Sequence, residues 1–200
     1  MLQQLRPAVA LLLLMTGISG VAYPLMTTRI AQVAFHDKAN GSLIEQGGQV
    51  IGSELIGQSF IDPETGETLQ GYFRSRPSAA GAGYDAAASS GSNLGPTNPV
   101  LIDRVASEVA IIREENHLAD NAEIPVDLVT GSGSGLDPDI SPASANLQIP
   151  RVARQRGISE DQVRVIVDQY TSGRTLGIFG EPRVNVLKVN IALDEHYPMP

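Results

Sequence analysis

The chain has 200 residues but no cysteine, no tryptophan and only 4% aromatic residues. Without cysteine it can form no disulfide, no thiolate metal site and no thiol nucleophile, although disulfide-free proteins occur in every compartment. The length allows one or two modest domains, and the core of each must be built mainly from aliphatic side chains.

Positive charge is also scarce. Fourteen lysine and arginine residues face 22 aspartate and glutamate residues, which gives a formal net charge of −8. A chain this acidic repels phosphate backbones, and its basic residues cluster only at Arg151, Arg154 and Arg156. We therefore expect no nucleic-acid partner.

The motifs of nucleotide hydrolysis are missing. The only lysines are Lys38 and Lys188, and neither follows a glycine, so the chain has no Walker A phosphate-binding loop. Asp37-Lys38 is followed by Ala-Asn-Gly instead of the Thr-Gly-Thr that follows the phosphorylated aspartate of P-type ATPases. The three histidines lie far apart, and no Gly-x-Ser-x-Gly nucleophile motif occurs. We expect no catalytic residue and no metal site.

What the sequence does have is an apolar N-terminal segment. The stretch from Pro7 to Met26 carries no charge and has roughly the 20 residues that a helix needs to cross a membrane. A cleaved signal peptide is the competing interpretation, with Arg6 before the apolar run and small residues up to Ala22 as a cleavage site. We favour a retained anchor, and we expect its helix to end near Tyr23 and Pro24.

Three small residues of this segment, Thr16, Gly17 and Gly20, would share one helix surface, on which another membrane helix could pack closely. The charges on the two sides of the segment do not orient it. A short tail before a first apolar segment usually stays in the cytoplasm, so the C-terminal part would be exported. We divide the chain into residues 1–28, a short tail and membrane helix, and residues 29–200, a soluble domain.

The soluble part is predicted to have an α+β fold. Short apolar runs separated by glycines between Ser42 and Phe73 favour strands and turns. Residues 75–96 are rich in alanine, glycine, serine and asparagine and contain almost no large apolar side chain. This composition predicts a loop, which is either a contact surface or a plain linker.

Two helices have clear start signals. Asn98 and Pro99 suit the N-cap and first position of a helix that we expect to run to about Asn116. Ser159 and Gln162 have the spacing of a capping box, and the apolar residues that follow recur at helical intervals.

Three further elements are expected from weaker patterns. Ile124–Thr130 and Leu187–Leu193 read as strands, the second because apolar and polar residues alternate. A helix should begin at Ser141 and Pro142, be interrupted at Pro150 and end by Gly157.

Eight runs of residues, which follow one another along nearly the whole chain, resemble the sequences of the KdpC family. Proteins of this family are subunits of the bacterial Kdp-type potassium-transporting ATPase. They are GVAYPLMTT (20–28), ANGSLI (39–44), GSELIGQSF (52–60), YFRSRPSAA (72–80), SGSNLGPTNP (90–99), IPVDLVTGSGSGLDPDISP (124–142), QIPRVARQRG (148–157) and GEPRVNVLKVNIALD (180–194). A small insertion at residues 62–68 departs from that pattern.

The resemblance implies an accessory subunit of a high-affinity potassium-uptake complex in the bacterial inner membrane. Its partners would be a channel-like potassium-binding subunit, a P-type ATPase subunit that hydrolyses ATP, and the lipid around its single membrane helix. Family members are described as assembly factors and catalytic chaperones that raise the ATP affinity of the ATPase subunit. The chain itself would then hold no cofactor tightly and would meet ATP only through the complex.

Two hypotheses about the site remain open. In the first, the soluble domain is extracytoplasmic and lies over the side from which potassium enters. The polar loop from Arg74 to Pro99 would then contact the partner subunits, and Arg74, Arg76 and Asn93 are its candidate contact residues.

In the second, the domain lies in the cytoplasm and binds ATP directly. Gln148 would be the nucleotide ligand, because its amide can bond to adenine or ribose and the arginines of the QIPRVARQRG run supply positive charge. A third and less favoured possibility is a secreted binding protein released by cleavage after Ala22.

Overall fold

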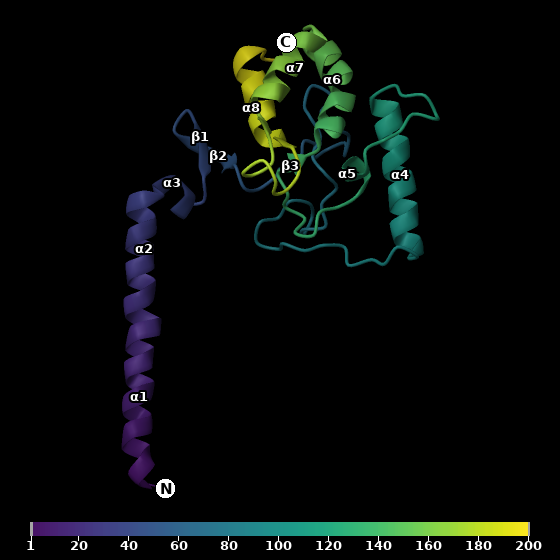
Figure 1. The fold of residues 1–200 in the computed structure, drawn as a ribbon. Coiled ribbons are helices and arrows are strands. Elements are labelled where there is room, and N and C mark those ends of the chain that lie inside the picture. Colours follow the sequence, from purple (N-terminus) through teal and green to yellow (C-terminus); the bar gives the residue numbers. More distant parts are fainter. Residues whose placement is uncertain (1, 200) are drawn as a thin grey trace. The chain divides into compact units, whose positions relative to one another are not determined.

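A computed structural model describes residues 2–199 and divides the chain into two compact units, residues 1–51 and 52–200. Figure 1 shows their elements, and each unit is described by itself. The boundary at residues 51 and 52 lies later than the division at residue 28 that we drew from the sequence.

The first unit is dominated by one long helix. A short 3-10 turn, η1 (Leu2–Gln4), leads into α1 (Leu5–Gly17), the π-helical segment η2 (Ile18–Ala22) and α2 (Tyr23–Ala34). Together these form one helix over Leu5–Ala34 that is long and apolar enough to cross a membrane, with none of its apolar window buried. The short helix α3 (His36–Ala39) follows.

The expected helix end at Tyr23 and Pro24 is wrong. Pro24 has no N–H to donate to the carbonyl of the preceding turn, and its ring crowds that turn in a regular helix. The helical turn before Pro24 is wider instead, because the Tyr23 N–H bonds to the Ile18 carbonyl, five residues back. This π-turn accommodates the proline, so the helix continues to Ala34.

A β-hairpin follows, in agreement with the strands and turns that we predicted from short apolar runs separated by glycines. Strands β1 (Leu43–Gln46) and β2 (Gln49–Ser53) pair through a two-residue turn at Gly47 and Gly48. Both glycines have positive φ, 61° and 79°, which is the conformation that a tight hairpin turn requires.

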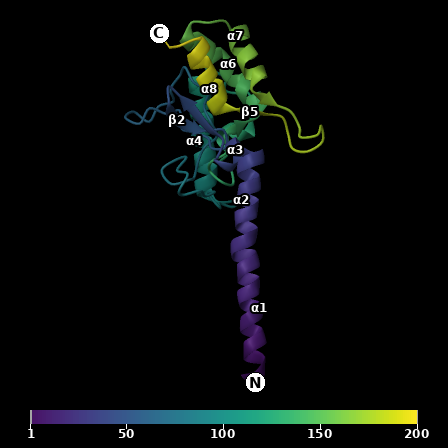
Figure 2. The ribbon, with the colours of Figure 1, turned by 90° about the vertical axis from the view of Figure 1, so that its left-hand side faces the viewer.

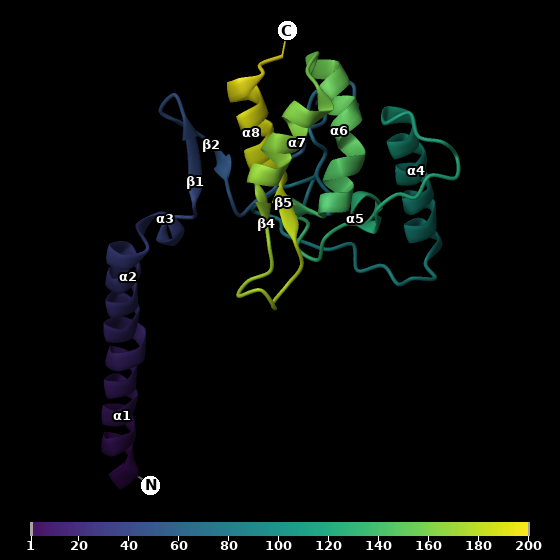
Figure 3. The same ribbon diagram turned by 45° about the horizontal axis from the view of Figure 1, so that its top comes forward.

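The second unit is built on three packed helices and a small sheet. Helices α6 (Pro142–Arg156), α7 (Glu160–Gln169) and α8 (Val186–His196) lie side by side in Figure 3. The antiparallel sheet has the order β3 (Asp139–Ile140), β5 (Arg183–Asn185), β4 (Thr171–Ser172). Their buried aliphatic side chains, with Phe73, form the main core. The prediction of an α+β domain behind one N-terminal apolar helix is confirmed.

Helix α4 (Pro99–Glu115) and the single turn α5 (Val126–Val129) form a smaller apolar cluster around Ile112 and Leu128. The predicted start of α4 is confirmed, because the Asn98 side chain accepts a hydrogen bond from the Val100 N–H at 2.9 Å. The strand expected at Ile124–Thr130 is wrong: the chain turns helically after Pro125.

The start of α7 and the end of α6 follow their sequence signals. Ser159 and Gln162 form the predicted capping box at the start of α7, and Gly157 ends α6 in the left-handed conformation with φ 68°. The predicted interruption at Pro150 is wrong. Pro150 and Asn146 are both exposed, so water can solvate the Asn146 carbonyl that the proline leaves without a donor.

The strand expected at Leu187–Leu193 is also wrong, because these residues lie in α8. Asn185 caps this helix by accepting a hydrogen bond from the Lys188 N–H at 3.0 Å. Asn190, which the alternating pattern placed on a solvent face, is buried and bonds to both the N–H and the carbonyl of Phe73. Because Asn190 is a polar residue at a core position of the helix, the sequence alternated between apolar and polar residues as a strand does.

Candidate functional site

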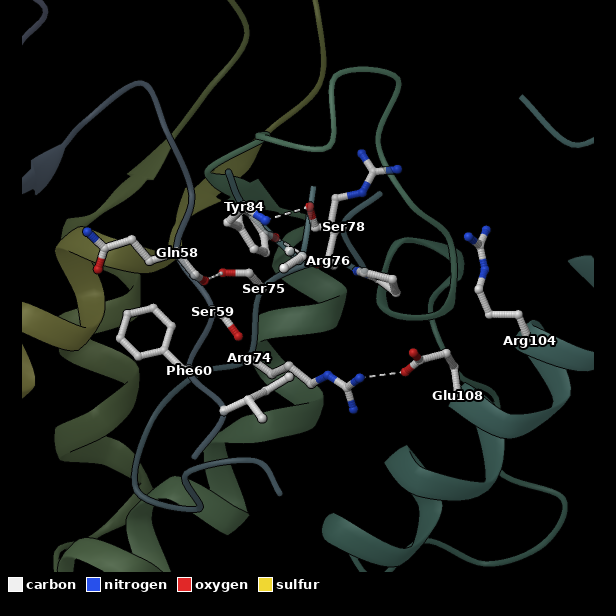
Figure 4. Close-up of a pocket in the computed structure, with 14 residues that line it drawn as sticks. Gln58, Ser59, Phe60, Arg74, Ser75, Arg76, Ser78, Tyr84, Arg104 and Glu108 are labelled. Atoms are coloured by element: carbon white, nitrogen blue, oxygen red, sulfur yellow. Dashed lines mark hydrogen bonds and ion pairs between the residues drawn. The ribbon is translucent and has the colours of Figure 1, made fainter. Parts of the chain in front are cut away.

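A cavity of about 240 Å³ opens between residues 58–61, residues 74–84 and the helix α4. Figure 4 shows its lining side chains, which include three arginines, three serines and one carboxylate. They are Arg74, Arg76, Arg104, Ser59, Ser75, Ser78 and Glu108. Two of these arginines form ion pairs with carboxylates of the chain, as described below.

Arg74 is held at both its side chain and its backbone. Its guanidinium forms ion pairs with Glu108 and Glu115 of α4, and only 11% of its side chain is exposed. Its backbone N–H donates to the Gln148 amide oxygen at 2.7 Å. Arg74, which we predicted to contact a partner, therefore ties the loop to α4 through its side chain and to α6 through its backbone.

Arg76 connects the loop to the segment before α6. Its guanidinium lies 2.9 Å from Asp137 and bonds to the carbonyls of Thr130 and Gly131. The Tyr84 hydroxyl donates to the Arg76 carbonyl at 2.6 Å, and burial raises the pKa of Tyr84 to about 12. Tyr84 therefore stays protonated and keeps this bond at physiological pH.

Most of the charged groups that line the cavity are already paired within the domain. Arg104 Nε is buried and has no hydrogen-bond partner among the described residues, whereas Arg74 Nη1 lies 3.5 Å from Glu115 Oε1 in an ion pair. The lining contains no histidine that could act as a base for its serine hydroxyls.

Gln148 lies in the interior, with 1% of its surface exposed. Its amide oxygen accepts from the Arg74 N–H and from Arg151, while its nitrogen donates to the carbonyls of Arg74 and Ser144. These four bonds use every donor and acceptor position of a carboxamide. The predicted nucleotide ligand has a structural role here and offers no free group to a ligand.

The three arginines that we grouped with Gln148 do not converge. Arg151 is 2% exposed and donates to the carbonyls of Gln70 and Tyr72 as well as to Asn116 and Gln148. Burial lowers its pKa to about 10, which still leaves it charged at neutral pH.

Arg156 is also buried and turns toward the C-terminal helix, whereas Arg154 is exposed. Arg156 donates to the carbonyls of Gly71 and Tyr197, forms an ion pair with Asp194 at 2.8 Å and lies over the ring of Tyr72. Two of the three guanidiniums therefore hold the segment around residues 70–72 in place.

The remaining predicted contact residues are exposed. Thr16, Gly17 and Gly20 lie on the long helix, where a Cβ atom added at Gly17 would meet nothing within 4 Å. Asn93 lies in the loop with φ 52° and donates to the Gly91 carbonyl at 3.2 Å. These positions are accessible to a partner, and their role as contacts stays a prediction.

Sequence reasoning missed one exposed segment, the connection between β4 and β5. All of residues 172–183 are exposed, including Leu176, Ile178 and Phe179. The signal was present as TLGIF, a short apolar run between Gly173 and Gly180 that no expected element included.

Comparisons with known proteins agree on one family. A family model described as KdpC, the c chain of the K⁺-transporting ATPase, matches residues 5–195. A potassium-transporting ATPase KdpC subunit from Mycobacterium tuberculosis is 54% identical over 194 residues, which covers 97% of this chain and 99% of the relative. The protein of the same name from Rhodospirillum rubrum is 53% identical over 199 residues, covering 100% and 99%. That from Caulobacter vibrioides is 54% identical over 199 residues, covering 99% and 96%.

Proposed function

Because the chain belongs to the KdpC family of K⁺-transporting ATPase subunits, we propose that it holds a potassium-uptake complex together and raises the ATP affinity of the ATPase subunit. The observation that carries this proposal is the extent of the family match, which covers both the apolar helix and the folded domain. Hydrolysis would belong to the P-type ATPase subunit of the complex.

The long helix is the natural anchor in the inner membrane. None of the residues of α1 or α2 is buried, so the apolar side chains of this helix are available to lipid and to other membrane helices. The small residues Thr16, Gly17 and Gly20 allow the backbone of another helix to come close, and we assign them to contact with the channel-like subunit.

The effect on ATP affinity would be indirect. Gln148 has no free hydrogen-bonding group, and Arg151 and Arg156 are used within the domain. We infer that this domain is extracytoplasmic and favours one conformational state of the complex, which changes ATP affinity at the distant site as a coupling between states.

The test is to purify the complex with and without this subunit from cells that express all the other subunits. We expect the complex without it to lose part of its subunit association and to need a higher ATP concentration for half-maximal hydrolysis. Equal association and an equal ATP dependence in the two preparations would contradict the proposal.

The side of the membrane can be tested separately, because the chain has no cysteine of its own. Ser90→Cys and Ser172→Cys each place one thiol at an exposed position of the domain. We expect a membrane-impermeant thiol reagent to label both variants in intact cells. Labelling only after lysis would contradict the extracytoplasmic assignment and would make direct ATP contact the better hypothesis.

A further inference from the structure

The connection between β4 and β5 is an ordered hairpin that exposes its apolar side chains. Leu176, Ile178 and Phe179 are 84%, 68% and 61% exposed. The backbone of Thr175 and Phe179 pairs through two hydrogen bonds of 2.8 and 3.0 Å, and Arg174 bridges to Glu181 at 2.6 Å. Figure 2 shows this connection projecting from the helices of its unit. We call residues 174–181 the apolar hairpin.

The turn of the apolar hairpin carries an unfavourable residue. Leu176 and Gly177 have φ of 55° and 77°, and the Ile178 N–H bonds to the Thr175 carbonyl, which is the pattern of a type I′ turn. Asparagine or glycine is preferred at the first central position, because a bulky side chain is strained at positive φ.

In the part of the domain that the structure describes, Leu176 makes no core contact that would compensate for this strain. Tyr84 also has positive φ, but its hydroxyl and N–H bond to Arg76 and Ser78. The Leu176 side chain is almost fully exposed, so it adds nothing to the core. A strained, exposed leucine at the tip of an ordered turn indicates a function outside the isolated fold.

The charges around the tip favour a protein over a lipid surface. Elements that lie on a membrane combine apolar side chains with free lysine or arginine, which bind anionic headgroups. Here Arg174 is paired with Glu181, and Arg183 is paired with Asp139 at 3.0 Å. The acidic chain adds repulsion from anionic lipid.

The size of the tip argues against a dimer of this chain. A stable interface buries about 800 Å² on each partner, which is more than three side chains of this kind can supply. The tip can contribute only where other contacts already hold the two proteins together. A subunit that is anchored beside its partners by a membrane helix meets this condition.

We propose that the apolar hairpin inserts Leu176, Ile178 and Phe179 into an apolar pocket on the extramembrane surface of another subunit of the same complex. The proposal rests on the proposed function, because it requires that the chain is assembled with those subunits. It assigns the contact to a segment different from the polar loop of residues 74–99.

Photocrosslinking identifies the molecule that the apolar hairpin contacts. Benzoylphenylalanine is incorporated in place of Leu176 in cells that express the whole complex, and the native membranes are irradiated. We expect the adduct to be with another subunit of the complex. An adduct with lipid or with a second copy of this chain, or no adduct, would overturn the proposal. Val165 on α7, which is 65% exposed, is the control position, and an equal yield of the same adduct from it would also count against the proposal.

A substitution separates contact from folding. Asparagine tolerates positive φ, so Leu176→Asn keeps the turn while it removes the apolar side chain. We expect Leu176→Asn combined with Phe179→Ser to lower the fraction of chain that copurifies with the complex by about threefold or more. Val165→Asn should leave that fraction unchanged.

The outcomes distinguish the two proposals. If the wild-type chain does not copurify with the transport subunits, the proposed function fails. If the wild-type chain and the hairpin variant copurify equally, with both folded by circular dichroism, only the hairpin proposal fails.

Discussion

Two segments of the domain that lack helices and long strands differ in how they are held. Residues 70–78, which we call the pinned segment, are bonded from outside by Arg151, Arg156, Gln148 and Asn190. The apolar hairpin is bonded mainly to itself, and its side chains point into solvent. One segment is part of the fold, whereas the other projects from it.

The difference shows that irregular segments of one domain can be ordered by the fold or can project from it. The pinned segment overlaps the start of the polar loop of residues 74–99, and buried arginines and amides order it within the domain. The apolar hairpin has the side chains whose burial would stabilise a complex. We therefore expect substitutions in the first to affect folding and substitutions in the second to affect assembly.

Arg151→Met gives the largest expected effect. It removes the donor for four acceptors, including the carbonyls of Gln70 and Tyr72. Leaving these buried and partly buried acceptors without a donor should lower the free energy of unfolding by about 3–5 kcal/mol. Urea unfolding of the full chain in mild detergent, followed by circular dichroism, measures the loss.

Arg154→Met is the matched control, because Arg154 lies on the same helix but is exposed. We expect a change within about 0.5 kcal/mol. If the two variants unfolded at the same urea concentration, the pinned segment would not depend on its buried arginine.

Gln148→Leu has the next largest effect. Leucine has a similar volume but leaves the partly buried N–H and carbonyl of Arg74 without their bonds to the amide. We expect a loss of about 2–3 kcal/mol in the free energy of unfolding. Calorimetric titration of the full chain with ATP should give no saturable heat before or after the substitution. Saturable ATP binding that Gln148→Leu abolishes would contradict the structural role of this residue.

Asp127→Asn weakens the N-terminus of α6, the helix that carries Gln148 and Arg151. The carboxylate accepts from the Ser141 N–H at 2.7 Å and from the hydroxyls of Ser141 and Ser144. We expect a loss of about 1–2 kcal/mol at neutral pH.

The pH dependence of this loss is a second readout. Burial raises the pKa of Asp127, but its hydrogen bonds outweigh burial and leave it below the ordinary value of 3.8. The stabilisation is therefore complete above about pH 4 and is lost as the pH falls through the folded-state pKa. The difference between wild type and Asp127→Asn should shrink below pH 4, and a constant difference would contradict this assignment.

The smallest expected effect has the opposite sign. Leu176→Asn relieves the strain at positive φ and should raise the free energy of unfolding by about 0.5–1 kcal/mol. Thermal unfolding of the two full chains side by side provides the measurement. A clear destabilisation would mean that the Leu176 side chain supports the fold.

The sequence correctly predicted the helix ends that are determined by neighbouring residues. Asn98 with Pro99, Ser159 with Gln162, and Gly157 each act on neighbouring backbone groups, so the sequence alone locates those helix ends. The family could also be identified from the quoted runs.

The errors arose where distant groups decide the outcome. Asn190 is buried because it bonds to Phe73, which lies 117 positions earlier, so the helix α8 looked like an alternating strand. Gln148 looked available for a nucleotide because its partner Arg74 is 74 positions away. Pro150 was tolerated because it faces solvent, which the helix packing determines.

Amide hydrogen exchange tests the contrast between the two segments most directly. The full chain in detergent is compared with the same chain in the purified complex, with exchange measured by mass spectrometry. We predict that the amides of Phe73 and Arg74, which donate to Asn190 and Gln148, exchange slowly in both samples. The amides of residues 174–181 should slow by about tenfold or more only in the complex. Unchanged exchange in the apolar hairpin, together with protection of the pinned segment that appears only in the complex, would contradict the account.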